Sequence, residues 1–221
     1  MNLDEFLNSQ EEIYDSFRDI SNVVQYGLSP DENALGTGGY IIALRHSRAI
    51  SDKISDFANL VSKVVPSIAY SSEDIHTTIS DFSVGMNFSP DNKVLDKLCS
   101  IVKASLANHD VSAPEINYGK WLYKPDAVIV PGIPDEKFIE LSNAVVEEGK
   151  EAGYNLRNPW GAHITALRIT EKKPANELAQ FYSLVEFAPI IGKSRAESVD
   201  VGYFSLDKNR FSFTPCEKFR I

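Results

Sequence analysis

The 221-residue sequence predicts an α+β fold in which two related lobes face each other across a cleft. Segments with apolar residues at helical spacing alternate with short β-prone segments along the chain. The order strand, helix, strand, helix occurs twice, and each series contains a strand with the pattern His-x-Thr. The two patterns begin at His76 and His163. Because the halves share little sequence identity, the prediction of two lobes depends on this repeated order and on the positions of the two patterns.

The composition is that of an ordinary soluble globular protein, and 43% of the residues are hydrophobic. This length can bury the core of one large domain or of two closely packed lobes. No apolar run approaches the roughly 20 residues that span a bilayer, and the N-terminus is acidic, unlike a secretory signal. Cys99 and Cys216 are too few and too distant in sequence for a disulfide framework or a paired-cysteine metal site. We expect two reduced thiols, a cytoplasmic location and no membrane association.

The net charge of −9 argues against sequence-independent binding to duplex DNA, which depends on many cationic contacts with phosphates. The charge is unevenly distributed, since residues 157–221 contain ten Lys and Arg against seven Asp and Glu. A locally basic region of this kind can bind a small anion while the rest of the chain is acidic. Incidental scatter of charge in an acidic protein is the alternative interpretation.

The first predicted element is an amphipathic helix over residues 3–25, where apolar residues recur at helical spacing between acidic ones. The glycine-rich run 36–39 is expected to be a flexible turn, because no Gly-Lys-Ser/Thr follows it and the next element is a strand. That strand covers residues 40–44. Residues 47–65 predict a helix with a serine N-cap and a proline just beyond its end. A strand over residues 75–84 contains the first His-x-Thr run.

A helix is predicted over residues 91–107, followed by an extended, aromatic-rich region over residues 115–130. The next helix begins at a proline and covers residues 134–152. The loop 157–161 leads into the strand 162–170, which contains the second His-x-Thr run.

The C-terminal region predicts a helix over residues 174–184, which again begins at a proline. Two strands over residues 198–206 and 210–219 flank a short polar turn and predict a hairpin. The chain contains no low-complexity segment and no obvious linker.

Each His-x-Thr run presents an imidazole and a hydroxyl on one face of its strand, because side chains two residues apart emerge on the same side. With four His and six Thr in the chain, chance gives about 0.1 matches to this pattern. If the two strands are neighbours, the side chains of both runs converge. The sequence therefore predicts a site for metal-free acid–base chemistry on a phosphate, with His76, Thr78, His163 and Thr165 as catalytic residues.

At these residues the sequence resembles the two-histidine (2H) phosphoesterase superfamily, which includes bacterial RNA 2′-5′ ligase-like proteins, cyclic nucleotide phosphodiesterases and domains of A-kinase-anchor proteins. The resemblance covers about residues 36–221. It implies a bilobal α+β fold with two pseudo-symmetric lobes and antiparallel-rich sheets around a central cleft. It also implies that residues 1–35 are an N-terminal helical extension, for which covering an exposed apolar face is the simplest role.

The run from His163 to Arg168 also resembles the longer His-x-Thr-x-x-Arg form of the ligase-like branch, which implies that Arg168 contacts substrate. In a regular strand, however, His163 and Thr165 share a face and Arg168 points to the other face. Arg168 can reach the site only if a bulge or the end of the strand redirects it. Otherwise we expect it to form a surface or inter-lobe ion pair.

Imidazole has an unperturbed pKa near 6.5, so one histidine can accept a proton from the attacking hydroxyl while the other protonates the leaving oxygen. The threonine hydroxyls would donate hydrogen bonds to the non-bridging phosphate oxygens. No metal and no cofactor are expected. The expected substrate is a small phosphodiester that contains ribose: a 2′,3′-cyclic phosphate, a 2′-5′-linked oligonucleotide or a cyclic oligonucleotide. We expect a monomer.

Two other interpretations stay open. In the first, the same cleft holds a nucleotide without cleaving it, so that the chain is a binding module. In the second, the two His-x-Thr runs are coincidental and the chain is an α+β interaction protein.

Base recognition is expected from aromatic stacking, since every nucleobase has a π-face. Trp160, three residues before His163, is the first candidate, and the others are Tyr118, Trp121, Tyr123 and Tyr203. Core packing is the alternative role for each of them. The cationic candidates for phosphate contacts are Lys120, Lys124, Lys193 and Arg195. His46 and His109 belong to no recognisable constellation and are expected to be structural or exposed.

Overall fold

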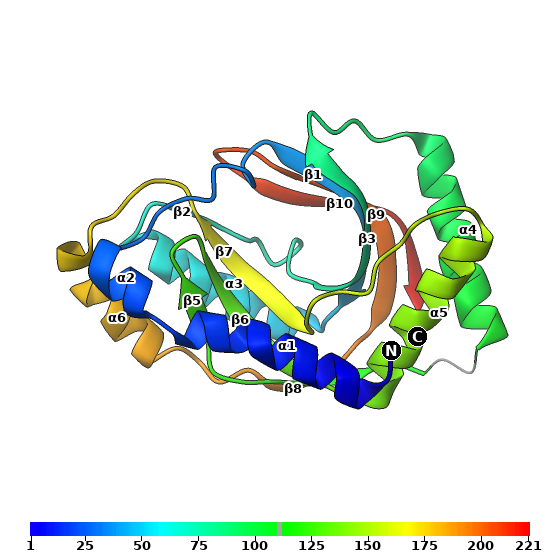
Figure 1. Cartoon of the computed structure of the whole chain (residues 1–221), viewed down its shortest axis with the longest axis horizontal. Helices are drawn as coiled ribbons and strands as arrows, with labels where there is room; N and C mark the ends of the chain where they lie inside the picture. Colours follow the sequence, from blue (N-terminus) through cyan, green and yellow to red (C-terminus); the bar gives the residue numbers. More distant parts are fainter. Residues whose placement is uncertain (110–111) are drawn as a thin grey trace.

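The structure is a computed structural model that describes residues 1–109 and 112–221. Two sheets form the two lobes, and every pairing between described strands is antiparallel. Figure 1 shows the sheets one above the other, with helices around them. The predicted α+β class with antiparallel sheets is therefore confirmed.

The upper sheet in Figure 1 has four strands in the order β10-β9-β1-β3. Their bounds are β1 (Thr37–Arg45), β3 (Thr77–Met86), β9 (Ser198–Leu206) and β10 (Phe211–Arg220). The lower sheet has the order β2-β7-β6-β4-β8, and β5 pairs with β6 beside this path. Its strands are β2 (Ser67–Ala69), β4 (Glu115–Tyr118), β5 (Leu122–Lys124), β6 (Ala127–Pro134), β7 (His163–Ile169) and β8 (Gly192–Arg195).

Each sheet takes strands from both halves of the chain. The last two strands, β9 and β10, complete the sheet that begins with β1 and β3, whereas the early strand β2 pairs with β7. The repeated order of elements in the sequence therefore does not divide the chain into one lobe after the other. It does place the two His-x-Thr strands, β3 and β7, in different sheets, and these two strands contact each other.

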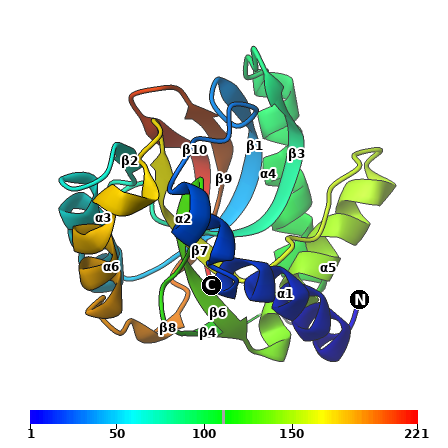
Figure 2. The same ribbon diagram turned by 60° about the vertical axis from the view of Figure 1, so that its left-hand side comes forward.

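Helices cover the two ends of the molecule. Figure 2 shows α3 and α6 on one side and α4 and α5 on the other. The helices are α1 (Leu3–Arg18), α2 (Ser21–Tyr26), α3 (Arg48–Ser62), α4 (Asn92–Asn108), α5 (Glu136–Glu151) and α6 (Ala179–Glu186), with a 3-10 turn η1 (Ala175–Glu177) before α6. None of the helices in the described part of the chain combines the length and apolar character that a membrane span requires.

The predicted N-terminal helix is divided into α1 and α2. Asp19 ends α1 with a non-helical backbone (φ −75°, ψ 89°), and its carboxylate accepts a hydrogen bond from the Ser21 backbone N–H at 3.1 Å. Such local bonds from Asp compete with helix continuation. Helix α2 then ends at Gly27, which has a φ of +87°. A Cβ at Gly27 would lie 2.1 Å from the Lys173 carbonyl oxygen, so only glycine fits here.

The predicted turn at residues 36–39 is wrong for most of its length, because β1 begins at Thr37. Glycine at position 38 lets neighbouring groups approach the strand closely: a Cβ there would lie 2.8 Å from the Phe204 carbonyl oxygen and 2.9 Å from the Phe88 ring. The extended region after residue 115 consists of β4, β5 and the start of β6. The short strands β2 and β8 were not predicted, since three or four residues show too little alternation to be recognised.

Candidate active site

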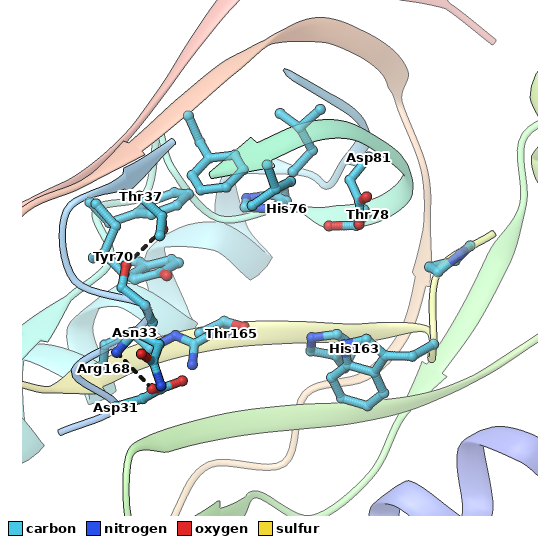
Figure 3. A pocket seen from close by; sticks show the side chains of 18 residues that line it. Asp31, Asn33, Thr37, Tyr70, His76, Thr78, Asp81, His163, Thr165 and Arg168 are labelled. Atoms are coloured by element: carbon cyan, nitrogen blue, oxygen red, sulfur yellow. Dashed lines mark hydrogen bonds between the residues drawn. The ribbon is translucent and has the colours of Figure 1, made fainter. Parts of the chain in front are cut away.

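His76 and His163 lie at the ends of two strands that face each other. His76 directly precedes β3 in the upper sheet, and His163 is the first residue of β7 in the lower sheet. Figure 3 shows the two imidazoles on opposite sides of one pocket. The fold therefore brings the two runs to one pocket, as predicted.

The pocket has a volume of about 350 Å³ and lies between the two sheets. This volume is at the lower end of the range for small-molecule sites, about 300–1,000 Å³. Both histidines and both threonines line it, together with the predicted Trp160 and Arg168. The lining residues are Asp31, Asn33, Ala34, Thr37, Ile41, Tyr70, His76, Thr78, Asp81, Val84, Pro159, Trp160, His163, Thr165, Arg168, Phe204, Leu206 and Phe211.

A β-bulge follows the threonine in both runs. Between β1 and β3, Ala43 pairs with Thr78 but Ile42 pairs with Ser80, so that Ile79 is the extra residue. Between β6 and β7, Ile129 pairs with Thr165 but Val128 pairs with Leu167, so that Ala166 is the extra residue. A bulge of one residue exchanges the faces of the strand beyond it.

The residue five positions after each histidine consequently faces the pocket. In the second run this residue is Arg168, so the bulge at Ala166 redirects its side chain to the same face as Thr165. In the first run it is Asp81, which was not predicted to belong to the site. Applying the spacing of the second run to the first would have found Asp81.

The hydrogen bonds of the two imidazoles are also equivalent. The Nδ1–H of His76 donates to the Asp74 carbonyl oxygen at 2.6 Å, and the Nδ1–H of His163 donates to the Gly161 carbonyl oxygen at 3.1 Å. A carbonyl can only accept, so the proton of each neutral ring is assigned to Nδ1. The Nε2 atoms, which no described residue bonds, are left to exchange protons with a ligand.

Aromatic rings hold each imidazole in place. His163 stacks on Trp160, with ring centroids 3.8 Å apart, and His76 stacks on Phe211 at 5.7 Å. Trp160 therefore contacts the imidazole directly, and the His163 ring covers one face of the indole. This contact makes Trp160 a positioning residue for His163 as well as a part of the pocket wall.

Both imidazoles are neutral near pH 7. Burial lowers the pKa of His76 to about 4; the bond to Asp74 opposes this effect, and the nearby Arg45 charge adds to it. Burial lowers the pKa of His163 to about 3; the bond to Gly161 opposes this effect, and the Arg168 charge adds to it. A bound anion would favour the imidazolium form, since an opposite charge nearby raises the pKa of a histidine.

Arg168 is the basic group of the pocket. Its guanidinium forms an ion pair with Asp126 at 3.1 Å, yet its Nε–H is buried without a partner among the described residues. A buried donor left unbonded costs about 1–3 kcal/mol, so an anion at this position would be favourable. Asp81, across the pocket, is partly buried, and burial raises the pKa of its carboxyl although the Arg157 charge opposes this.

The N-terminal helix is bonded to β6 and to the residue just before the strand that carries His163. Gln10 is 2% exposed, and its side-chain amide bridges two backbone groups: it donates to the Gly132 carbonyl at 3.3 Å and accepts from the Ala162 N–H at 3.1 Å. The Tyr14 hydroxyl accepts a further bond from the Gly132 N–H at 3.3 Å. Helix α1 therefore fixes the residue before His163, in addition to covering apolar surface.

Two predicted base-stacking residues, Tyr118 and Tyr203, lie outside the pocket, which corrects the prediction for them. Tyr118 is 2% exposed, and its hydroxyl lies 2.5 Å from the Thr77 hydroxyl and 3.0 Å from His46 Nε2. Its ring has no open face for a base. Tyr203 packs near Phe88, with ring centroids 6.3 Å apart.

The remaining candidates are structural or lie elsewhere. The Trp121 indole is buried and donates to the Pro189 carbonyl at 2.9 Å, while Tyr123 packs against Phe181. Lys193 pairs with Glu115 at 2.8 Å. His46 is buried in the core with both ring nitrogens bonded, as its expected structural role requires. Lys120, Arg195 and His109 do not line the pocket.

Several further residues of the pocket were not predicted from the sequence. Asp31 and Asn33 come from the segment between α2 and β1, and Tyr70 follows β2. No pattern in the sequence marks them, because each reaches the pocket only through the packing of its segment. Within residues 1–109 and 112–221, no group of three or more His, Cys, Asp or Glu side chains is arranged to hold a metal ion.

No protein-family model matches the sequence, and no curated protein matches it. Solved structures do match the fold. E. coli LigT complexed with NADP+ aligns with a TM-score of 0.53 at 14% identity, covering 84% of this chain and 98% of LigT. A structure described as a phosphoesterase aligns at 0.51 and 15% identity, covering 83% and 98%. A protein from Thermus thermophilus aligns at 0.56 and 13%, covering 82% and 97%. The chain therefore has the fold of E. coli LigT and of these other structures, which is the bilobal fold that the resemblance at its paired His-x-Thr runs implied.

Proposed function

We propose that this chain is a phosphodiesterase that cleaves a small ribose-containing phosphodiester by acid–base catalysis with two histidines. The observation that supports the proposal most is the equivalence of the two runs. Each contributes an imidazole whose Nδ1–H donates to a backbone carbonyl and whose Nε2 has no bond to any described residue, on opposite sides of one pocket. Two such groups are what in-line displacement at phosphorus needs.

The proposed reaction requires one neutral and one protonated imidazole. The neutral Nε2 takes the proton of the attacking hydroxyl, from water or from the substrate ribose, as the new O–P bond forms. The bond between phosphorus and the leaving oxygen breaks, and the protonated Nε2 of the other histidine gives its proton to that oxygen. The pair thus ends with its roles exchanged, and proton exchange with water restores the starting state.

The negative charge that accumulates on the non-bridging oxygens has donors available. The hydroxyls of Thr78 and Thr165 and the guanidinium of Arg168 belong to the pocket wall. Donors preorganised in this way stabilise a transition state more than a ground state. The substrate phosphate also supplies the negative charge that raises the pKa of one imidazole, so binding itself would prepare the acid.

A ribose phosphodiester is proposed as the substrate class: a 2′,3′-cyclic phosphate, a 2′-5′-linked oligonucleotide or a cyclic oligonucleotide. E. coli LigT, a protein of the same fold, has been crystallised with 3′-AMP and with ATP, which supports a nucleotide ligand here. The volume of the pocket suits one nucleotide unit.

The test is a screen of the purified chain in EDTA against 2′,3′-cyclic nucleotides, 2′-5′ and 3′-5′ oligonucleotides and cyclic dinucleotides, with products identified by mass. The proposal predicts turnover of at least one of them. Binding of 3′-AMP without turnover of any phosphodiester would instead identify a nucleotide-binding module. Neither binding nor turnover would contradict both.

A further inference from the structure

A second hollow of about 330 Å³ lies beside the catalytic pocket. Helix α1 forms one wall with Ile13 and Phe17, and the lower sheet forms the floor with Ala127 and Ile129 from β6 and Lys124 from β5. Lys124 was predicted only as a candidate cation for phosphate contacts, and the hollow itself exists only because α1 packs against β5.

The hollow and the catalytic pocket meet at β7. Both are lined by Trp160, His163, Thr165 and Arg168. The strand register explains this, because Ile129 pairs with Thr165 and Ala127 pairs with Arg168, which places them on one face of the sheet. A ligand that occupies both hollows would therefore pass from one to the other beside His163 and Thr165, where the proposed reaction takes place.

The surfaces of the hollow suit an aromatic ring next to an anion. The Trp160 side chain, which is 39% exposed, offers a contact to a flat ring, and the nearly buried Phe17, Ala127 and Ile129 give the hollow apolar walls. Two cations flank it: Lys124, whose ammonium lies 4.9 Å from the Phe17 centroid, and Arg168. Asp126 pairs with both, at 3.6 and 3.1 Å, so the three groups together carry one positive charge.

We propose that this hollow binds a second nucleotide unit of the substrate, on the far side of the scissile phosphodiester from the unit in the catalytic pocket. The inference rests on the proposed function and narrows it: the substrates are oligonucleotides or cyclic dinucleotides, with a nucleoside on each side of the phosphorus, rather than 2′,3′-cyclic mononucleotides. Lys124 acts on the phosphate or ribose of the second unit, and the apolar floor contacts its base.

The experiment compares kcat/KM for a dinucleotide and for a 2′,3′-cyclic mononucleotide in the unmodified chain and two variants. Lys124→Ala removes the cation, and Ala127→Leu fills the floor of the hollow. Each variant should lower the ratio of dinucleotide to mononucleotide kcat/KM about tenfold, which corresponds to about 1.4 kcal/mol. The matched control is Lys120→Ala, an exposed lysine that lines neither hollow and should leave the ratio unchanged.

An unchanged ratio in Lys124→Ala would overturn the inference, whether kcat/KM stays the same for both substrates or falls equally for both. An equal fall for both substrates indicates a structural effect of the substitution. Lys124→Ala keeps the test valid if Ala127→Leu does not fold. If the unmodified chain turns over none of the phosphodiesters in the screen, the proposed function fails. In that case the second subsite is tested by titrating the chain with 3′-AMP and with a 2′-5′ dinucleotide. Tighter binding of the dinucleotide that Lys124→Ala weakens would support the second subsite. Equal binding of the two ligands would contradict it.

Discussion

Asp81 and Arg168 occupy equivalent positions in the two halves of the pocket, each five residues after a histidine and each turned inward by a bulge after the threonine. The two halves are therefore alike in backbone and opposite in charge. An anion is favoured on the Arg168 side, and a hydrogen-bond donor on the Asp81 side. This polarity gives the pocket a means of orienting a substrate that its two histidines alone do not provide.

Replacing Asp81 by the neutral amide in Asp81→Asn should tighten the binding of 3′-AMP. The substitution removes a partly desolvated negative charge from a pocket that takes an anion, and a gain of about 1 kcal/mol, roughly fivefold in Kd, is expected. Calorimetric titration measures it. Asp96→Asn, at an exposed position of α4, is the control and should bind as the unmodified chain does. Weaker binding by Asp81→Asn would contradict the proposed polarity.

The pH dependence of kcat/KM should follow the lowered pKa of the two pocket imidazoles. In the free chain one of them must be protonated for reaction, and with a pKa of about 4 for His76 the protonated fraction falls about tenfold per pH unit above that value. We therefore expect kcat/KM to increase steadily as the pH is lowered from 8 to 5. The pH dependence of kcat should be weaker, because bound phosphate favours the imidazolium. A kcat/KM that increases with pH over this range would show that neither pocket imidazole acts as the acid.

Folding stability should change with pH in the opposite sense. Burial lowers the pKa of His46 to about 3, so the folded chain keeps this ring neutral while the unfolded chain protonates it near pH 6.5. The contribution of His46 is fully present above pH 6.5 and is lost as the pH falls toward 3, by at most about 1.4 kcal/mol per unit. Urea unfolding at pH 7 and pH 5 measures the loss. His46→Gln should have a smaller difference between the two pH values, and an identical difference would mean that His46 is protonated in the folded state.

Gln10→Leu should impair catalysis from a distance. The substitution leaves the buried Ala162 N–H without its acceptor, at a cost of about 1–3 kcal/mol of stability, and frees the residue before His163. The Gly132 carbonyl loses one of its two side-chain donors and keeps the Tyr14 hydroxyl. Because the substitution disturbs alignment rather than binding, kcat should fall more than KM rises. Gln25→Leu, at an exposed position of α2, is the matched control. Normal kcat in a folded Gln10→Leu chain would show that α1 does not position His163.

The sequence predicted the parts of the site that depend on local pattern. His76, Thr78, His163 and Thr165 could be placed together because strand alternation puts each His and Thr on one face, and because the repeated order of elements predicted that the two strands face each other. The composition of the two sheets, which mix strands from both halves of the chain, could not be predicted in this way. The orientation of Arg168 stayed open, since a bulge at Ala166 leaves no mark in the sequence. The corresponding bulge at Ile79 turns Asp81 toward the pocket, which regular strand alternation does not predict.

The wrong predictions share a different cause. Tyr118 and Tyr203 were chosen because an aromatic ring can stack on a base, but the same rings fill cores equally well, and only the packing around His46 and Phe88 distinguishes the two uses. Asp31 and the second hollow were missed because they depend on segments that meet only in the folded chain.

The most direct measurement is the turnover of the best substrate by His76→Ala and His163→Ala, each in EDTA, with products detected by mass. If the two imidazoles act as base and acid on one phosphorus, each substitution should reduce kcat/KM by about 10²–10⁴-fold while the unmodified chain keeps full activity in EDTA. Undiminished activity in either variant, or loss of activity in EDTA by the unmodified chain, would contradict the account.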